Sequence, residues 1–252
     1  MKLSDKVAIV TGSTRGIGKA IGVGFAKEGA SVVIAARTET DNEKMPGTIY
    51  KTAEEIQALG RKVLPVKCNV ADEESVNSMV QKALEQFGHI DILVNNAGIA
   101  YYPPVLETPV KRWELVIRVN LMGTFLCTKA VLPTMVEQRR GSIINISSVS
   151  ATDRGPSITG VAYGVSKAGI ERFTWGLAAE VGKYNIAVNA LKPSGVVNTE
   201  GMRFMLPDAD TSQWVSPDKM VKAAIFLADQ DATGVTGVVA FDEEICAWHG
   251  LL

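Results

Sequence analysis

Tyr163 and Lys167 have the residue types and the spacing that most directly suggest catalysis in this 252-residue chain. Residues four apart lie on one face of a helix, so the phenol and the ammonium can converge on one ligand. A neighbouring ammonium favours the phenolate and lowers the pKa of a tyrosine from about 10, which suits a general acid–base group. Elsewhere the same spacing is usually packing and solvated charge, so the flanking residues must decide between the two interpretations.

Four serines precede this pair, namely Ser147, Ser148, Ser150 and Ser157. A hydroxyl that donates to a substrate carbonyl oxygen would stabilise the negative charge that develops there during reduction. Ser147 ends an apolar run, and strand alternation points its side chain away from that of Ser148. We therefore expect Ser148 to face the ligand, with Ser150 as the alternative.

A glycine-rich segment at 11–18, TGSTRGIG, follows the first apolar run and precedes the first helical pattern. Gly12 permits a tight turn, Gly16 lets the backbone approach a pyrophosphate, and Gly18 lets helix and strand pack closely. The helix N-terminus then offers free N–H groups and a partial positive charge to the phosphates. Any tight turn between a strand and a helix can use glycine, but this position favours a dinucleotide site built from Gly12, Ser13, Thr14, Arg15, Gly16, Ile17 and Gly18.

The dinucleotide is expected to be NADP(H), with NAD(H) possible. An NAD site usually has an acidic residue at the end of the second strand, whereas the second apolar run here ends with Ala36, Arg37 and Thr38. The guanidinium groups of Arg15 and Arg37 could bracket a 2′-phosphate through forked, charge-assisted hydrogen bonds. The alternative is that both arginines are solvated surface residues.

Short apolar runs alternate with longer helical patterns along the whole chain. Their near-continuous apolarity is typical of strands buried on both faces of a parallel sheet. The expected strands are 6–11, 31–36, 62–67, 91–96, 142–147, 186–191 and 237–241, and the expected helices are 17–27, 52–59, 72–87, 111–136, 162–181 and 217–228. Pro133 should kink or end the fourth helix. This alternation predicts one doubly wound α/β domain over residues 1–252, with ligands at the carboxyl ends of the strands.

Composition and charge narrow the classes of function. The chain has 26 basic and 27 acidic residues, so its net charge of −1 gives no footprint for nucleic acid or an anionic membrane. No apolar run approaches the roughly 20 residues needed to span a bilayer. Three widely spaced cysteines fit reduced thiols, and their spacing from the two histidines suggests no metal site. We expect a cytoplasmic protein that acts on a small molecule without a metal.

Four motifs in this order resemble those of the short-chain dehydrogenase/reductase family: the glycine segment at 11–18, the NNAG motif at 95–98, Asn120 in a V-N-x-x-G context, and the YGVSK motif at 163–167. The segment 37–60, with its GTIY and AEEI patterns, is similar to the hydroxysteroid dehydrogenase-like subfamily. The resemblance implies a single-domain Rossmann-type α/β fold, a doubly wound seven-stranded parallel sheet with helices on both faces. It also implies hydride transfer between a nicotinamide and a carbonyl or alcohol carbon, with Tyr163 as the general acid/base.

The resemblance also implies roles for individual residues. Asn120 would either hold a water in a proton relay or bond backbone at a helix distortion, and Lys167 would bond the nicotinamide ribose. Asn69 stands where many members have Asp, and Ser194 interrupts the usual Pro-Gly pair, so two positions depart from the family pattern. The other implied cofactor contacts are Thr38, Val70, Asn96, Ala97, Gly98, Tyr163, Pro193, Val196 and Thr199.

Spacing within the family reopens the choice of serine. The gap from Ser148 to Tyr163 is 15 residues (163 − 148), longer than the family usually shows, and the usual spacing would select Ser150. We retain Ser148, because strand register fixes a side chain better than loop length does. The segment 153–160 contains Gly and Pro and can absorb the extra residues as a bulged loop, with Ser157 as a surface or substrate contact.

The substrate pocket is expected between the loops 99–108 and 150–161 and the segment 199–216. Apolar and amphipathic side chains there could line it; the candidates are Tyr101, Tyr102, Met202, Phe204, Met205 and Trp214, with Arg154 as an anchor for an anionic group. The alternative is that these residues pack a mobile lid or a subunit contact. A fatty-acyl, a steroid-like and a small xenobiotic substrate all stay open.

Symmetric interfaces could form on the long helices 111–136 and 162–181 and at the apolar C-terminus, so a homotetramer or homodimer is expected. Two other classes of function remain. An NADP-binding sensor or structural protein with little turnover predicts a degraded catalytic set, but Asn120, Tyr163 and Lys167 are intact. A nucleotide-dependent isomerase or dehydratase is usually longer after the lysine than the 85 residues found here (252 − 167).

Overall fold

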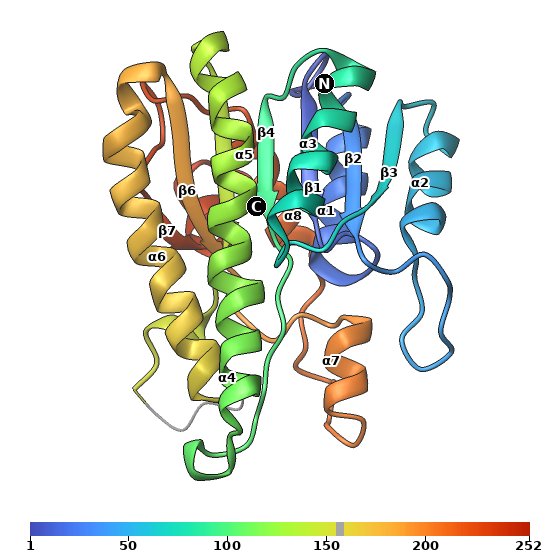
Figure 1. Ribbon diagram of the computed structural model, residues 1–252, viewed down its shortest axis with the longest axis vertical. Coiled ribbons are helices and arrows are strands. Elements are labelled where there is room, and N and C mark those ends of the chain that lie inside the picture. The colour runs from blue at the N-terminus through green and yellow to red at the C-terminus, as the bar shows by residue number, and fades with distance from the viewer. Residues whose placement is uncertain (155–158) are drawn as a thin grey trace.

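The computed structural model describes residues 1–154 and 159–252 and contains a seven-stranded sheet in the order β3-β2-β1-β4-β5-β6-β7 (Figure 1). Every adjacent pair of strands is parallel. The strands are β1 Val7–Thr11, β2 Ser31–Ala36, β3 Val63–Lys67, β4 Ile92–Asn95, β5 Gly141–Ile146, β6 Ile186–Lys192 and β7 Val239–Phe241. Each lies within one or two residues of its expected position, so the doubly wound parallel sheet is confirmed.

Two layers of helices cover the sheet, and each layer packs on its own hydrophobic core. Helices α1, α2, α8 and α9 share one core, and helices α3, α5 and α6 share the other. The helices are α1 Gly16–Lys27, α2 Ile49–Ala58, α3 Glu73–Phe87, α4 Val110–Ile117, α5 Gly123–Gln138, α6 Val161–Val181, α7 Glu200–Met205, α8 Asp218–Ala228 and α9 Asp242–Trp248. The short helices α7 and α9 were not among the expected elements.

Alternation along the central strands explains why their sequences are apolar throughout. Ile9 of β1 and Leu93 of β4 are paired neighbours and face the core under α3, α5 and α6. Val10 and Val94, one position further along, face the core under α1 and α8. A strand covered on both faces has no side that tolerates polar residues.

The helical stretch Val110–Gln138 differs from the single helix expected over 111–136. A π-helical turn at Arg118–Met122 separates α4 from α5. Pro133 was expected to kink or end this helix. It does not end it, because α5 continues to Gln138. Pro133 is exposed, so the carbonyl that loses its hydrogen bond to the ring nitrogen can be hydrated instead.

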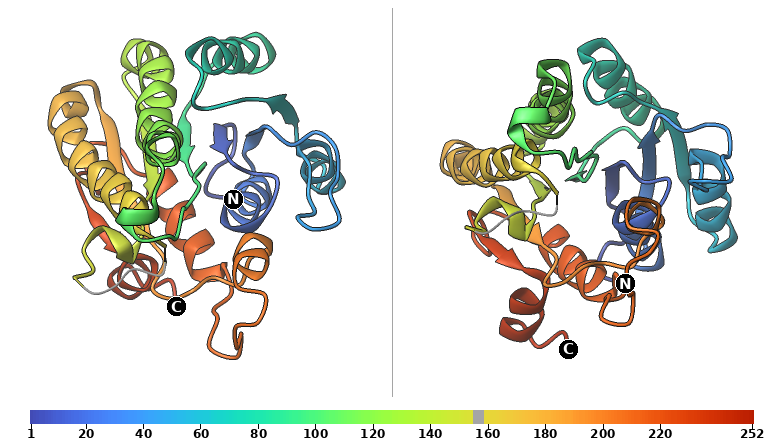
Figure 2. Two further views of the ribbon diagram at one scale, coloured as in Figure 1. Left: turned by 60° about the horizontal axis from the view of Figure 1, so that its bottom comes forward. Right: turned by 90° about the horizontal axis from the view of Figure 1, so that it is seen from below.

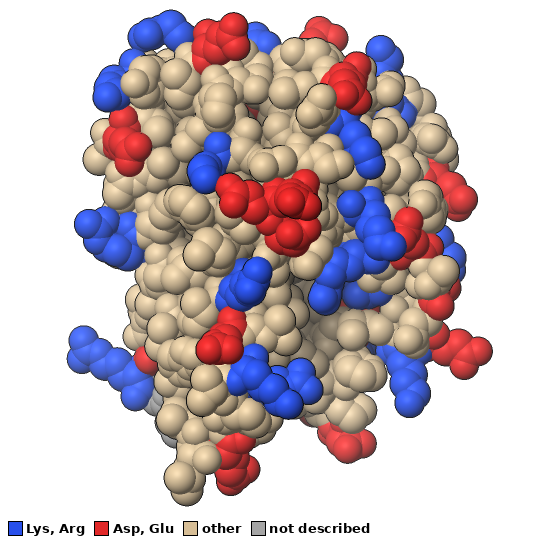
Figure 3. Space-filling view, viewed as in Figure 1, with Lys and Arg blue, Asp and Glu red and all other residues tan. Residues whose placement is uncertain are grey.

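The same stretch, among the described residues, is the one helix long and apolar enough to cross a membrane by length and composition. Its α5 part buries Leu126, Cys127, Val131 and Met135 in the core beneath the sheet, as a core helix does. Acidic and basic side chains are interspersed over the face that Figure 3 shows, which includes this stretch.

The loops that follow β1, β4, β5 and β6 converge at one edge of the sheet, at the bottom of Figure 1 and facing the viewer in the right panel of Figure 2. Helix α7 lies at the same edge. In a parallel sheet this carboxyl edge is where ligands bind. The loops at this edge therefore contain the motif residues that are expected to act together.

Candidate active site

The glycine segment turns tightly because two of its glycines have left-handed backbone, Gly12 at φ 66° and Gly16 at φ 56°. A Cβ on Gly12 would lie 2.8 Å from Cα of Ala97, and a Cβ on Gly18 would lie 2.3 Å from Nδ2 of Asn96. The NNAG segment therefore packs directly on this turn. Nδ2 of Asn96 also donates to the carbonyls of Thr11 and Gly12 at 2.9 and 3.1 Å.

Several residues expected at the cofactor prove to hold the turn itself. The buried Ser13 hydroxyl donates to the Val10 carbonyl at 2.7 Å and accepts from the Ala35 N–H at 3.1 Å. The side chains of Thr14 and Val70 are also buried, and Ile17 packs against the core. The backbone of this segment is therefore the part that can contact a ligand.

Arg15 was expected beside a 2′-phosphate, but its guanidinium donates to backbone carbonyls. Its Nε donates to the Pro46 carbonyl at 2.9 Å, and its Nη2 donates to the carbonyls of Met45 and Gly47, both at 3.0 Å. The guanidinium thus fastens the turn at 45–47 to the glycine segment. Arg37, at the carboxyl end of β2, is exposed. Of the two arginines, Arg37 is the one whose charge faces solvent at this edge.

Asn69 and Thr38 lie on the same edge. Asn69 follows β3, is exposed, and its Oδ1 accepts from the Ala71 N–H at 3.3 Å. Thr38 follows β2 and accepts the N–H of Ile49 at 3.0 Å, at the start of α2. Both residues are placed where an adenine or its ribose would approach from the glycine segment.

Ser148 and Tyr163 meet at the carboxyl end of β5. Ser148 is the second residue after the strand, and Tyr163 lies in the first turn of α6. Burial raises the pKa of the Tyr163 phenol, and a hydrogen bond with the Ser148 hydroxyl opposes that rise. The two hydroxyls are therefore neighbours at this edge.

The other serines are bound elsewhere. The Ser147 hydroxyl donates to Oε1 of Glu171 at 2.8 Å, and Ser150 shares a hydrogen bond of 2.9 Å with Thr159. Ser157 lies outside the described residues. The choice of Ser148 over Ser150 stays a prediction.

Lys167 is buried next to the Tyr163 ring. Its Nζ donates to the Ile146 carbonyl at 2.6 Å and lies 5.4 Å from the centre of the Tyr163 ring. Burial lowers the pKa of Lys167 to about 8. The pKa of Tyr163 is raised overall, because the effect of burial exceeds that of the hydrogen bond with Ser148. The expected lowering of the Tyr163 pKa by Lys167 stays a prediction.

Asn120 lies in the π-helical turn and is completely buried. Its Nδ2 donates to the Ile99 carbonyl and to the Ser166 hydroxyl, both at 2.9 Å, and its Oδ1 accepts from the Ile99 N–H at 2.9 Å. Of the two expected roles, the contacts of the side chain correspond to the structural one. They tie the loop after β4 to α6, which carries Tyr163.

A buried ion pair between Glu171 and Lys192 was not among the expected site residues. Oε1 of Glu171, besides accepting from Ser147, pairs with Nζ of Lys192 at 3.3 Å, and both charged side chains are under a tenth exposed. Lys192 also lies 4.8 Å from the centre of the Phe241 ring. Glu171 follows Lys167 by four residues on the same helix, a spacing that could have indicated it. Lys192 ends an apolar strand and carries no such signal.

The segment after β6 follows a defined path despite the inserted serine. The Ser194 N–H donates to Oδ1 of the buried Asp242 at 2.8 Å, which anchors the insertion next to Pro193. Val196 is partly buried and accepts the N–H of Val215 at 2.9 Å. Thr199 caps α7, its Oγ1 accepting from the Met202 N–H at 3.2 Å.

Glu200 was also missed, and no local pattern indicates it. Its Oε2 accepts the N–H of Gly16, the first residue of α1, at 2.9 Å. An anionic oxygen therefore lies at the helix N-terminus that was expected to bind phosphate.

The expected substrate residues divide between the loop after β4 and α7. The Tyr102 hydroxyl contacts Sδ of Met205, and burial raises the pKa of Tyr102 to about 12. The Tyr101 ring faces the guanidinium of Arg112 at 5.8 Å. Met202 is partly buried, whereas Arg154 is exposed.

The residues present fit a dinucleotide. The glycines allow the tight turn that brings the N-terminus of α1 to this edge, and that N-terminus already holds a carboxylate oxygen, as it would hold a phosphate oxygen. The fold and this edge together define a protein of the dinucleotide-binding α/β class. Among the described residues, no group of three or more His, Cys, Asp or Glu side chains gathers in a way that could hold a metal ion.

Comparison with known proteins specifies the family. The family model for short chain dehydrogenase matches residues 6–209, so the chain belongs to the short-chain dehydrogenase/reductase family of oxidoreductases. Hydroxysteroid dehydrogenase-like protein 2 is 40% identical in Bos taurus and 38% identical in Homo sapiens, each over 99% of this chain. The chain spans 59% of the length of each of these two relatives.

Solved structures agree with this assignment. A structure from Xanthomonas campestris, assigned as a dehydrogenase, superposes with a TM-score of 0.90 at 36% identity and covers 99% of this chain and 92% of its own. A short chain dehydrogenase from Mycobacterium thermoresistibile superposes with a TM-score of 0.88 at 30% identity, over 98% of this chain and 88% of its own. The resemblance to the hydroxysteroid dehydrogenase-like subfamily is confirmed, and family membership implies an NAD(P) cofactor.

Proposed function

We propose that this protein is an NADP(H)-dependent oxidoreductase that interconverts a carbonyl and a secondary alcohol. The observation that carries the proposal is the hydrogen-bonded pair of Ser148 and Tyr163, with Lys167 buried beside it, at the edge that also holds the glycine segment. The nicotinamide supplies or accepts the hydride when bound. The residues of the chain must manage the proton and the charge on the substrate oxygen.

Tyr163 is the group that gives the proton to the carbonyl oxygen. Because its pKa is raised in the free protein, the phenol is fully protonated at neutral pH and is ready as an acid for reduction. Ser148 donates to the same oxygen and stabilises the negative charge that develops on it. Lys167, held at the Ile146 carbonyl, is positioned to meet ribose hydroxyls and to favour phenolate in the reverse reaction.

The preference for NADP(H) rests on Arg37. It is exposed at the end of β2, where a 2′-phosphate would lie, and a guanidinium binds phosphate through paired hydrogen bonds. Arg15 contributes by holding the turn at 45–47. Arg37→Ala should therefore reduce the ratio of catalytic efficiencies for NADPH over NADH, and a wild type that uses NADH at least as well as NADPH would overturn the preference.

The substrate is a small carbonyl or alcohol compound with an apolar body. Tyr102 and Met205 bring the loop after β4 into contact with α7 at the edge of the site. The subfamily resemblance makes keto- and hydroxysteroids one class to test, beside fatty-acyl and small xenobiotic carbonyls.

A symmetric homodimer or homotetramer is part of the proposal. Phe125 of α5 and Val165 and Trp175 of α6 are large apolar residues that are more than two-fifths exposed, on helices that pack side by side (Figure 1). Exposed apolar patches of this kind mark contacts between subunits. Light scattering that shows a monomer at micromolar concentration would contradict this part.

The decisive experiment is NADPH consumption over a panel of steroid, acyl and small xenobiotic carbonyls. Tyr163→Phe is the matched control, because it removes only the hydroxyl, and we expect turnover to fall by about 10³-fold. Cofactor binding without turnover on any carbonyl would favour a sensor of the same fold. Equal turnover in Tyr163→Phe would exclude Tyr163 as the acid.

A further inference from the structure

Helix α7 touches the glycine segment through two consecutive residues. Oε2 of Glu200 accepts the N–H of Gly16 at 2.9 Å. Cβ and Cγ2 of Thr199 lie 3.2 Å from the point where Gly16 would carry a Cβ. The N-terminus of α7 therefore lies directly on the N-terminus of α1.

The charge of Glu200 is well suited to this position. The N-terminus of a helix carries a partial positive charge and free N–H groups. The first turn of α1 contains no acidic residue of its own, and the side chain of Arg15 at its N-cap makes no capping hydrogen bond. Glu200 thus supplies, from 184 residues away, the anion that this helix end lacks.

A pyrophosphate would require the same N–H groups. Phosphates bind at the N-terminus of the first helix of such folds because the glycines let the backbone approach. One N–H cannot serve two anions, and a carboxylate next to a pyrophosphate is repelled by it. Glu200 must therefore leave Gly16 before a dinucleotide can seat fully.

Helix α7 can move at low cost. It has six residues, none of them fully buried, and its first and last residues, Glu200 and Met205, contact Gly16 and Tyr102. Thr199 caps it internally, so the helix can shift as a unit without losing its first turn. Elements with few buried contacts are those that open locally.

We propose that Glu200 is an internal competitor of the dinucleotide, which holds α7 against the glycine segment until the cofactor displaces it. This inference rests on the proposed cofactor and deepens it. Release of Glu200 frees α7 from the glycine segment, so α7 reports cofactor occupancy to the substrate side through its contact between Met205 and Tyr102. The affinity of the intact chain for the cofactor is lowered by the fraction of molecules in which Glu200 is bound.

Calorimetric titration with NADP⁺ tests the proposal in four proteins: wild type, Glu200→Ala, Glu200→Gln and Glu243→Gln. Glu200→Ala should bind about tenfold more tightly, because one charge-assisted hydrogen bond no longer competes. Glu200→Gln keeps a weaker acceptor and the helix propensity, so it should lie between the two. Glu243, in α9, forms an exposed ion pair with Lys219 of α8. Glu243→Gln removes the same charge from this pair and should match the wild type.

Hydrogen exchange gives a readout that does not depend on catalysis. In the free protein, the Gly16 amide should exchange faster in Glu200→Ala than in the wild type. On addition of NADP⁺, residues 199–205 of the wild type should exchange faster, because Glu200 has been released. Both results are expected together with the tighter binding.

The outcomes separate this inference from the proposal on which it rests. A wild type that binds NADP⁺, with Glu200→Ala binding no more tightly, overturns the competition by Glu200 alone. Failure of all four proteins to bind NADP⁺ or NAD⁺ overturns the dinucleotide function, and the inference with it.

Discussion

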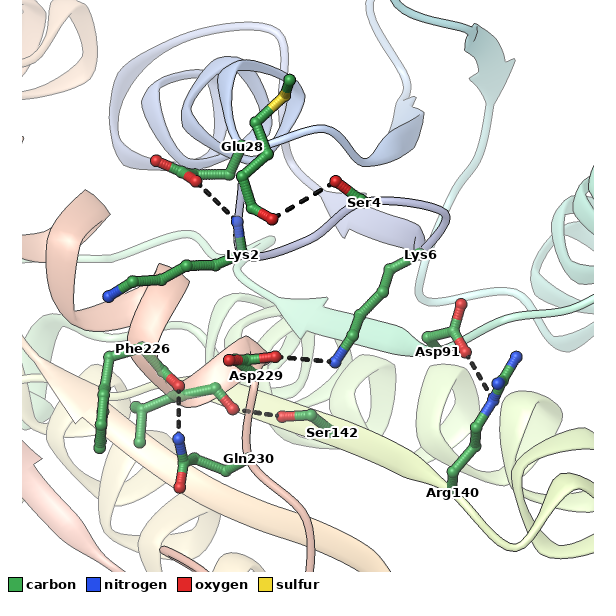
Figure 4. Close-up of polar contacts among 12 residues, drawn as sticks. Lys2, Ser4, Lys6, Glu28, Asp91, Arg140, Ser142, Phe226, Asp229 and Gln230 are labelled. Carbon is green, nitrogen blue, oxygen red and sulfur yellow. Dashed lines mark hydrogen bonds and ion pairs between the residues drawn. The ribbon is translucent and has the colours of Figure 1, made fainter.

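The two edges of the sheet use charged side chains in different ways. At the amino edge, shown in Figure 4, the buried Asp91 accepts the Val7 N–H at 2.8 Å through one oxygen and pairs with Nε of Arg140 at 2.9 Å through the other. Lys6 and Asp229 form a further pair there at 3.2 Å. These contacts join the starts of β1, β4 and β5 and leave each charge with a partner.

At the carboxyl edge, Lys192 and Glu171 form one buried ion pair, but two other charged groups are held by backbone and not by an opposite charge. Lys167 rests on the Ile146 carbonyl, and Glu200 rests on the Gly16 N–H. Such contacts can be exchanged for contacts to a ligand. The comparison indicates that the amino edge serves stability, whereas the carboxyl edge keeps its polar groups ready for binding, at some cost to the folded state.

The largest expected effect is on turnover at the carboxyl edge. Ser148→Ala should lower turnover by about 10²-fold or more, because it removes a donor to the substrate oxygen and the hydrogen bond to Tyr163. Ser150→Ala is the matched control, since its hydroxyl is bonded to Thr159, and its loss should be much smaller. Steady-state kinetics measure both, and the reverse order would refute the assignment of Ser148.

The corresponding variant at the amino edge should affect stability instead. Asp91→Ala leaves the Val7 N–H without its acceptor, whereas the 58% exposed Arg140 side chain can be hydrated instead, and we expect a loss of about 1–3 kcal/mol in the free energy of unfolding. Urea denaturation measures it. Turnover per folded molecule should stay at the wild-type value, and a loss of turnover in the folded fraction would show that the two edges are not separate.

Lys167→Met should change how stability depends on pH. Burial lowers the pKa of Lys167 from 10.5 to about 8, so between these values the unfolded chain binds a proton that the folded chain does not. By linkage, this group makes the folded state more stable as pH rises from about 8 to 10, by at most about 3 kcal/mol. The variant should lack that gain.

The measurement must be a difference between the two proteins. Burial raises the pKa of the Cys68 thiol from 9.0 to about 11, so that group lowers stability over the same pH range. Urea titrations of wild type and Lys167→Met at pH 8, 9 and 10 cancel the contribution of the thiol. Parallel curves for the two proteins would mean that Lys167 is not held as a buried, destabilised cation.

The strands, the glycine turn and the pairing of Ser148 with Tyr163 could be predicted because local patterns encode them. A strand buried on both faces is apolar throughout, and strand register orients the residue that follows. Contacts between distant segments have no such signal. Arg15 with the turn at 45–47, and Glu200 with Gly16, depend on which loops meet at one edge.

The environment of Tyr163 could not be predicted for a related reason. The four-residue spacing correctly places Lys167 next to the ring. It gives no sign of the Ile146 carbonyl that accepts a hydrogen bond from Lys167, or of the burial that dominates both pKa values. Asn120, in the π-helical turn, likewise contacts Ile99 and Ser166, which lie far from it in the sequence.

The smallest expected effect concerns the surface pair at the amino edge. The side chains of Lys6 and Asp229 are 32% and 44% exposed, so water and salt screen their attraction. Lys6→Ala should cost about 0.5 kcal/mol or less, and this loss should vanish in about 1 M NaCl, where the screening length is about 3 Å. The loss in Asp91→Ala should largely persist at that salt concentration, because the carboxylate is buried and one of its contacts is to the Val7 backbone N–H. Equal, salt-sensitive losses in the two variants would mean that the amino edge is stabilised by its surface charge and not by the buried carboxylate.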